Sequence, residues 1–374
     1  MITFFSNYIN DHQIPFCEAM YALTNGEFRF VATTEMSEER KRLGYIDKSD
    51  QYPFVIKSFE GENYAAALEL GYESDVVIMG ESPDVFIEKR LEENKLTFRY
   101  SERFFKQGRW RILDPRVAYS CYKGHTRYRK KNVHMLCASA YTAPDCNFIF
   151  AYPQKAYKWG YFPVVKHYED IQDVLKNKKK NTILWVARLI PLKHPEYPIL
   201  VAKKLKEAGY DFTLKIIGIG PAEEKMRKMI EKYHLEDRVF LLGAMSAECV
   251  RAHMEESEIF LFTSNRKEGW GAVMNESMNS ACAVVANGII GSVPYLIASG
   301  ENGLIYRNKL KDLYCKTKWL LDNPDKRQEM GKKAYQTLVD TWNAMQAAER
   351  LLELIGDIQA GRKSRFENGP CSKG

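Results

Sequence analysis

Two glutamates, Glu268 and Glu276, stand eight positions apart, one on each side of a glycine-rich turn. The surrounding stretch, residues 258–288, has the pattern of a buried strand, a turn with the sequence GWGA at 269–272, a helix and another strand. A helix that begins at such a turn presents unpaired backbone N–H groups and a partial positive charge, which stabilise an anion such as a diphosphate. We therefore expect an anion-binding turn between two carboxylates; an ordinary surface loop with two solvated glutamates is the alternative.

A second group of candidate residues is basic and follows a predicted strand that begins at Thr182. Arg188 stands where this strand ends, and Lys193 stands in the loop after it. An arginine offers a planar fork of donors and a lysine a point charge, and both suit the oxygens of a diphosphate. A pair of surface cations without a ligand is the alternative interpretation.

Two further strand ends carry glycine. Gly218 follows a strand that begins at Phe212, and Gly243 follows one that begins at Arg238, with Met245 two positions later. Glycine lets the backbone pass close to a ligand, although glycine after a strand commonly only turns the chain. We expect Gly218 to approach the ligand, and a nucleotide base to lie beside Gly243 and Met245.

The elements that position these residues alternate short apolar strands with helical patterns in both halves of the chain. This pattern is typical of mostly parallel sheets covered by helices on both faces. At 374 residues the chain also exceeds what one hydrophobic core usually supports. We expect an α/β protein with two doubly wound, Rossmann-like domains and a ligand in the cleft at the carboxyl ends of their strands.

The linker between the two domains is predicted at residues 150–168, which lose periodicity and contain two prolines and a glycine. We place the first domain at residues 1–160 and the second at residues 161–340. A helix at residues 341–360, after a hinge-like TWNAM segment, is expected to cross back to the first domain. Residues 361–374 lack apolar periodicity, which predicts a flexible tail.

The composition, 45% hydrophobic and 28% charged, is typical of a globular protein. No apolar run approaches the roughly 20 residues of a membrane helix, and the first strand lacks the features of a signal peptide, so we expect a cytoplasmic protein. The eight cysteines are scattered without a CxxC pair, which argues against zinc and against a disulfide framework.

The net charge of +7 is concentrated between Val85 and Lys131, where fourteen Lys or Arg residues accompany five acids. Aromatic residues are interleaved with these cations, namely Phe104, Phe105, Trp110, Tyr119, Tyr122 and Tyr128. This combination suits an anionic membrane surface, and a solvated helical face is the alternative. Nucleic acid is not expected, because no recognition motif accompanies the charge.

Five segments, VARLIPLKH, IIGIGP, EGWGAVMNE, ANGIIGSVPYLI and GENGLIY, occur in this order between residues 180 and 345. As a set they resemble the donor-binding domain of the family 4 retaining glycosyltransferases, the "glycosyl transferases group 1" with the GT-B fold. Over the amino half the resemblance is one of topology only.

The resemblance implies a role for each matching residue. Arg188 and Lys193 are expected to hold the donor diphosphate, Glu268 the hydroxyls of the transferred sugar, and Glu276 the ribose hydroxyls. The amides of Trp270, Gly271, Ala272 and Val273 are expected to bind sugar and phosphate oxygens. The resemblance further implies retention of anomeric configuration by a front-face mechanism. No DxD motif is present, so we expect catalysis without a metal or another cofactor.

The amino half departs from the family in two places. Residues 7–13 replace a Gly-Gly loop that many relatives carry, and the predicted strand from Leu96 lacks a histidine that in relatives faces the sugar. Glu102 or Arg103 could take the place of that histidine. His12 is a further candidate for the acceptor side, with capping of the first helix as the alternative role.

The sequence therefore favours a glycosyltransferase that moves a sugar from a nucleotide-sugar, expected to be a UDP-sugar, to a lipid-linked or polysaccharide acceptor. The expected partners are the nucleotide-sugar, the acceptor and an anionic membrane at whose inner face the enzyme would lie peripherally. Two alternatives stay open: a catalytically silent sugar-nucleotide-binding subunit, and a nucleotide-sugar epimerase on the same fold.

Overall fold

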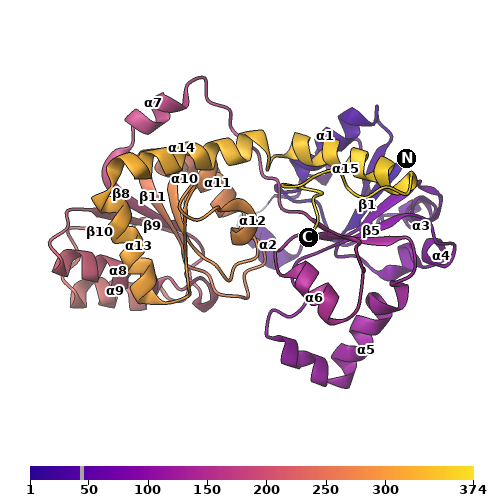
Figure 1. The fold of residues 1–374 in the computed structure, drawn as a ribbon, viewed down its shortest axis with the longest axis horizontal. Helices are drawn as coiled ribbons and strands as arrows, with labels where there is room; N and C mark the ends of the chain where they lie inside the picture. The colour runs from indigo at the N-terminus through magenta and orange to yellow at the C-terminus, as the bar shows by residue number, and fades with distance from the viewer. Residues whose placement is uncertain (43–45) are drawn as a thin grey trace. The chain divides into compact units, whose positions relative to one another are not determined.

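The computed structural model describes residues 1–42 and 46–374, which divide into two compact units. Unit 1 contains residues 1–164 and 343–374, and unit 2 contains residues 165–342. Each unit is built around one parallel sheet flanked by helices (Figure 1). The expected α/β class with two Rossmann-like sheets is therefore confirmed.

Unit 1 has a seven-stranded sheet in the order β3-β2-β1-β4-β5-β6-β7. The strands are β1 (Ile2–Ser6), β2 (Phe28–Ala32), β3 (Val55–Lys57), β4 (Val76–Met79), β5 (Thr97–Ser101), β6 (Val133–Cys137) and β7 (Ala156–Lys158). The helices are α1 (Ile14–Leu23), α2 (Glu38–Arg42), α3 (Asn63–Glu73), α4 (Glu88–Glu92), α5 (Pro115–Gly124), α6 (Thr142–Phe148) and α15 (Ala344–Gln359). Short 3-10 turns are η1 (Ser49–Gln51), η2 (Asp84–Phe86), η3 (Arg109–Leu113) and η4 (Thr126–Tyr128).

Unit 2 has a six-stranded sheet in the order β10-β9-β8-β11-β12-β13. Its strands are β8 (Lys179–Val186), β9 (Thr213–Ile217), β10 (Val239–Leu241), β11 (Ser257–Phe262), β12 (Ala283–Asn287) and β13 (Leu304–Tyr306). The helices are α7 (Ile171–Lys176), α8 (Glu196–Glu207), α9 (Glu223–Lys232), α10 (Ala247–Glu256), α11 (Val273–Asn279), α12 (Val293–Leu296), α13 (Leu310–Asp322) and α14 (Pro324–Asp340), with one 3-10 turn, η5 (Pro191–Lys193).

The central strands are buried along their whole length because helices cover both faces of each sheet. Every residue of β1, β4 and β6 in unit 1, and every residue of β12 in unit 2, is buried. The strand order reverses between β1 and β4 in unit 1 and between β8 and β11 in unit 2. In open parallel sheets such a reversal opens a crevice at the carboxyl ends of the strands, which is where ligands bind.

The helical segment near the carboxyl terminus is broken where the hinge-like sequence was expected. Helix α14 ends at Asp340, and Asn343 starts α15 by accepting a hydrogen bond from the Gln346 N–H group at 2.9 Å. Helix α15 then packs against α1, and both helices belong to unit 1 (Figure 1).

The expectation of a flexible tail is wrong for the last residues of the chain. Cys371 and Ser372 are fully buried, and the tail pairs with β7, where the Lys158 N–H group donates to the Ser372 carbonyl at 2.8 Å. Strand β7 itself lies within the expected linker, because three residues are too few to show a period in the sequence. The edge of the sheet supplies hydrogen bonds that a tail without apolar periodicity can still use.

No helix within residues 1–42 and 46–374 is long and apolar enough to cross a membrane. The same residues contain no group of three or more His, Cys, Asp or Glu side chains arranged to hold a metal ion.

Candidate active site

The predicted donor-site residues gather at the carboxyl ends of the unit 2 strands. The loop after β8 carries Arg188 and Lys193, and the loop after β11 carries Glu268. These two strands are neighbours in the sheet and lie at the point where the strand order reverses. The residues therefore flank the crevice that a parallel sheet offers to a ligand.

Lys193 and Glu268 form an ion pair, and their side chains are only 14% and 13% exposed. Two further bonds join the loops that carry them. The Asn265 N–H group donates to the Leu192 carbonyl at 2.9 Å, and the Thr263 hydroxyl donates to the Lys193 carbonyl at 2.7 Å. The expected cation and the expected carboxylate thus lie at one point of the fold.

Arg188 is exposed at the end of β8, and its position is set by its neighbours in the chain. The Ala187 N–H group donates to the Ile217 carbonyl at 3.1 Å, and the Leu189 N–H group donates to the Ile219 carbonyl at 2.9 Å. Throughout the described part of the chain, no acceptor or carboxylate engages the Arg188 guanidinium. Its donors are therefore available to an anion in solution.

Position 218 requires a glycine because its backbone packs closely against the end of the neighbouring strand β8. Its φ is +136°, and a Cβ atom there would lie 1.9 Å from the Ala187 carbonyl oxygen. The Gly218 N–H group also donates to the Gly243 carbonyl at 2.7 Å, which ties the loops after β9 and β10 together. Gly243 has φ +72° with open space around it, and Met245 is half-buried two residues later.

The buried side chain of Trp270 stabilises the turn between β11 and α11. Its side chain is fully buried, and its indole N–H donates to the Asn275 side-chain oxygen at 2.9 Å. At the next position, Gly271 has φ +77°, and a Cβ atom would lie 2.3 Å from Cζ of Phe262. The indole of Trp270 therefore has a structural role. A ligand could contact only the backbone of this residue, because its side chain is buried.

The backbone N–H groups at the start of α11 are open to a ligand. Among the described residues, none accepts a hydrogen bond from the N–H groups of Gly271, Ala272 or Val273, whereas the next amide, that of Met274, donates to the Gly271 carbonyl at 3.0 Å. Helix α11 spans seven residues, so its dipole is small and these three donors are its main contribution to anion binding.

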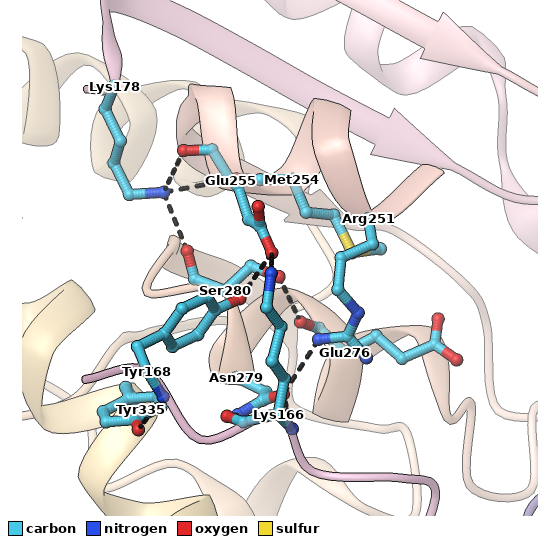
Figure 2. A network of polar contacts seen from close by, with 10 residues as sticks. All are labelled: Lys166, Tyr168, Lys178, Arg251, Met254, Glu255, Glu276, Asn279, Ser280 and Tyr335. Atoms are coloured by element: carbon cyan, nitrogen blue, oxygen red, sulfur yellow. Dashed lines mark hydrogen bonds and ion pairs between the residues drawn. The ribbon is translucent and has the colours of Figure 1, made fainter. Parts of the chain in front are cut away.

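Glu276 lies in the first turn of α11 and is half-buried. Its N–H group donates to the Ala272 carbonyl at 3.2 Å, and the Ser280 hydroxyl donates to its carbonyl at 3.0 Å. Figure 2 shows its carboxylate extending away from the polar network around Asn279 and Lys166. A carboxylate near a helix amino terminus is stabilised there by the unpaired amides.

A polar network that was not predicted from the sequence anchors the start of unit 2 to α10 and α11 (Figure 2). Asn279 donates to the Lys166 carbonyl at 3.0 Å and accepts from its N–H group at 2.8 Å. Glu255 accepts from the Lys166 ammonium and the Tyr168 hydroxyl, both at 2.7 Å. Asn279 is one helical turn beyond Glu276, so the network fixes the helix that carries the predicted ribose ligand.

Lys178 belongs to the same region and caps the carboxyl end of α10. Its ammonium donates to the backbone carbonyls of Ser257 at 2.7 Å and Ser280 at 2.8 Å, and more distantly to those of Met254 and Glu255. Burial lowers the pKa of this lysine. The cation lies where the unpaired carbonyls of a helix end carry partial negative charge.

In unit 1 the structure brings two of the three acceptor-side candidates together through Tyr161. The His12 ring stacks on the Tyr161 ring with centroids 5.8 Å apart, and the Tyr161 hydroxyl donates to Glu102 at 2.6 Å. Glu102 also pairs with Lys106. Tyr161 was not predicted, because it lies in the stretch taken for a linker.

His12 keeps one nitrogen unused. Its Nδ1 atom is buried and has no hydrogen-bond partner within the described part of the chain, and burial lowers its pKa. The ring is therefore neutral at physiological pH. The third candidate, Arg103, instead stacks over the Tyr141 ring at 4.3 Å.

The two parallel sheets are those of the GT-B fold class, and the second carries cations, a carboxylate and unpaired amides at its switch point. The family comparison agrees with this class. Residues 167–337 match the family described as glycosyl transferases group 1, and this part of the chain belongs to that family. The resemblance inferred from the sequence is thereby confirmed.

The relatives found by sequence cover part of the chain. A putative colanic acid biosynthesis glycosyltransferase, WcaL, of Salmonella typhimurium is 32% identical over 123 residues, which are 32% of this chain and 30% of WcaL. The alpha-D-kanosaminyltransferase of Streptomyces kanamyceticus is 31% identical over 180 residues, 48% of this chain and 44% of that enzyme. The matched region thus spans less than half of either relative.

The structural comparison covers nearly the whole chain. The crystal structure of Anabaena Alr3699/HepE in complex with UDP aligns with a TM-score of 0.68 at 14% identity, over 95% of this chain and 99% of that one. At this identity the likeness establishes the GT-B fold.

Proposed function

We propose that the protein is a retaining glycosyltransferase that transfers a sugar from a UDP-sugar to a glycan or lipid-linked acceptor, without a metal ion. The observation that carries the proposal is the ion pair of Lys193 with Glu268, together with the exposed Arg188 in the same segment after β8. In a nucleotide-sugar the anomeric carbon is bonded directly to the diphosphate, so sugar hydroxyls and phosphate oxygens are neighbours. A site for them needs a carboxylate and cations at one place.

UDP is the proposed nucleotide because the Anabaena structure with the same fold contains UDP. The polysaccharide part of the acceptor proposal draws on the Salmonella relative, whose name refers to colanic acid biosynthesis. We also propose that the enzyme works peripherally at an anionic membrane.

In the proposed reaction, the bond between the anomeric carbon and the diphosphate oxygen breaks, and the acceptor oxygen bonds to the same face of the sugar. The acceptor proton passes to an oxygen of the departing phosphate. Negative charge grows on the diphosphate as the bond breaks, and preorganised donors stabilise it most strongly in the transition state. Arg188, Lys193 and the amides of residues 271–273 supply these donors.

The two glutamates have separate roles in this proposal. Glu268 accepts hydrogen bonds from hydroxyls of the transferred sugar, and its pairing with Lys193 fixes its orientation. Glu276 accepts from the two ribose hydroxyls, and Gly243 and Met245 line the place of the base. On the acceptor side, His12 has a buried Nδ1 atom without a partner among the described residues, and Glu102 and Arg103 follow the end of β5.

A transfer assay tests the proposal. Purified protein is incubated with UDP-sugars, with and without polysaccharide or lipid-linked acceptors, and released UDP and the anomeric form of the product are measured. We expect acceptor-dependent release with retention, unchanged by EDTA. Glu268→Gln should reduce the rate about 100-fold, because a charged partner of the transition state is lost, whereas the exposed Glu236→Gln should leave it unchanged.

Other outcomes of this assay contradict the proposal. Tight UDP binding without turnover of any donor would identify a silent binding subunit. Conversion of the donor without an acceptor into an epimer would identify an epimerase. Loss of activity with EDTA, restored by Mg²⁺ or Mn²⁺, would contradict metal independence.

A further inference from the structure

One segment of unit 1, residues 109–123, exposes large apolar side chains that the fold does not cover. It consists of η3 and α5 and is called the η3–α5 surface below; α5 lies at the periphery of unit 1 (Figure 1). The exposed fractions are 63% for Trp110, 81% for Leu113, 65% for Tyr119 and 56% for Tyr122. Single exposed apolar residues are ordinary, but a cluster of this size marks an interaction surface.

Helical spacing explains why these side chains point outward. Val117 and Cys121, four positions apart on α5, pack with Ile112 against the core of unit 1. Residues on the opposite face of the helix, such as Tyr119 and Lys123, are exposed. The apolar exposure is therefore a fixed property of a folded helix.

The same surface carries a positive charge. Residues 109–123 include the cations Arg111, Arg116 and Lys123 but a single acid, Asp114. Asp114 caps α5 by accepting a hydrogen bond from the Arg116 N–H group at 3.0 Å. The Arg116 side chain also pairs with Asp114 at 3.5 Å, but it is 94% exposed. The Arg111 guanidinium lies 5.6 Å from the Trp110 ring centroid.

Two other cations of the basic stretch, Arg90 and Arg99, are used inside the fold and do not contribute to a surface. Arg90 is fully buried, and its guanidinium donates to the carbonyls of Gly71 and Leu96. Arg99 is paired with Asp84 at 2.9 Å. Arg116 and Lys123 of the η3–α5 surface are exposed instead, so their charge is available to a partner.

A hollow of about 680 Å³ adjoins this surface. Its lining combines apolar groups with arginines and is formed by Phe104, Phe105, Arg111, Asp114, Arg116, Val117, Ser120, Cys121 and His125. Cations beside an apolar floor suit an amphiphile with an anionic headgroup.

We propose that the η3–α5 surface docks onto an anionic lipid bilayer, with Trp110 and Leu113 entering the interfacial region and Arg111, Arg116 and Lys123 contacting lipid headgroups. A free polyanion such as nucleic acid would match the cations but offers no apolar phase for Leu113. A second copy docked symmetrically on this surface would oppose like charges. A bilayer supplies both anionic and apolar partners.

Vesicle flotation tests the docking surface with the full chain. The vesicles are phosphatidylcholine, with and without phosphatidylglycerol, and the variants are Trp110→Ser/Leu113→Ser and Arg111→Gln/Arg116→Gln/Lys123→Gln. The matched controls are Trp319→Ser, an aromatic that is 40% exposed in unit 2, and Lys326→Gln/Lys332→Gln/Lys333→Gln on α14. Thermal unfolding of each variant verifies that it is folded.

We expect the wild type and both controls to float with phosphatidylglycerol vesicles and much less with phosphatidylcholine alone. Loss of each surface cation should weaken partitioning about five-fold, so the triple variant should lose about 100-fold. The Trp110→Ser/Leu113→Ser variant should lose binding at every salt concentration.

A fluorescence measurement separates insertion from simple charge attraction. Brominated phospholipid should quench Trp110 in a Trp319→Phe background, because the other four tryptophans are no more than 4% exposed. Three results would overturn the proposal: equal binding to neutral and anionic vesicles, equal losses in the control variants, or concentration-dependent dimers that Leu113→Ser abolishes without any vesicle binding.

Discussion

His12 is the clearest acceptor-side candidate at the scale of single residues, because it stacks on Tyr161 while its Nδ1 atom has no partner among the described residues. Burial lowers its pKa, so the nitrogen is a neutral donor or acceptor near pH 7. We propose that His12 contributes to acceptor transfer rather than to the stability of unit 1.

His12→Phe tests this assignment because phenylalanine keeps the stack on Tyr161. We expect the melting temperature and UDP affinity to remain close to those of the wild type, while kcat/KM for transfer falls at least 10-fold. The matched control is Tyr161→Phe, which removes the 2.6 Å bond to Glu102 and should cost about 1 kcal/mol of stability. A His12→Phe enzyme that transfers normally but unfolds earlier would assign His12 a structural role.

His125 and His134 give unit 1 a pH-dependent stability. Burial is the main reason that the pKa of each is lowered from 6.5 to about 3. Below pH 6.5 the unfolded chain binds protons that the folded chain does not, so acid favours unfolding. The stabilisation is complete above pH 6.5 and is lost as the pH falls toward 3.

We expect the unfolding free energy to fall by up to about 1.4 kcal/mol per histidine for each pH unit below 6.5. Urea unfolding at a series of pH values measures this slope. His134→Gln, which retains hydrogen-bonding groups, should have a smaller slope than the wild type. An unchanged slope in this variant would show that His134 does not contribute.

At the scale of elements, the strand ends of unit 2 show how the site is held. The loops after β9 and β10 are joined through Gly218 and Gly243, and the loops after β8 and β11 through Leu192 and Asn265. Both glycines have positive φ, but only Gly218 also lacks room for a Cβ atom. Alanine substitutions at the two positions therefore separate the cost of backbone strain from the cost of a steric collision.

Gly218→Ala should destabilise unit 2 by more than about 3 kcal/mol, because it adds a collision with the Ala187 carbonyl to the backbone strain. Gly243→Ala, with open space around it, should cost about 1 kcal/mol from strain alone. Melting temperatures of both variants provide the measurement. Equal decreases in melting temperature would mean that the backbone moves away from the Ala187 carbonyl without a loss of stability, which would contradict this prediction.

The sequence predicted strands with long apolar runs and helices with clear periods, and it placed Arg188, Lys193 and Glu268 at strand ends. It could not predict β7 or the buried tail, because their stability comes from edge pairing rather than from a local pattern. His125 lies in the basic, aromatic stretch of the sequence, yet its ring stacks on that of Phe104 with centroids 4.5 Å apart. Burial of a histidine depends on tertiary neighbours that periodicity does not show.

At the scale of the whole molecule, the two units carry different chemistry. Unit 2 has the cations, carboxylates and free amides proposed to bind the nucleotide-sugar, and unit 1 has the His12–Tyr161–Glu102 group and the η3–α5 surface. Donor binding should therefore depend on unit 2 residues alone. Acceptor transfer and vesicle binding should depend on unit 1 residues, which allows each property to be removed separately.

Calorimetric titration of UDP tests the central claim, that the switch point of unit 2 binds the diphosphate of a nucleotide-sugar. We predict saturable UDP binding by the wild type, weakened at least 10-fold by Arg188→Gln and by Glu276→Gln, and unaltered by His12→Phe. Arg188 is exposed and Glu276 half-buried, so both variants should remain folded. Absence of UDP binding in the wild type, or wild-type affinity in both Arg188→Gln and Glu276→Gln, would contradict the account.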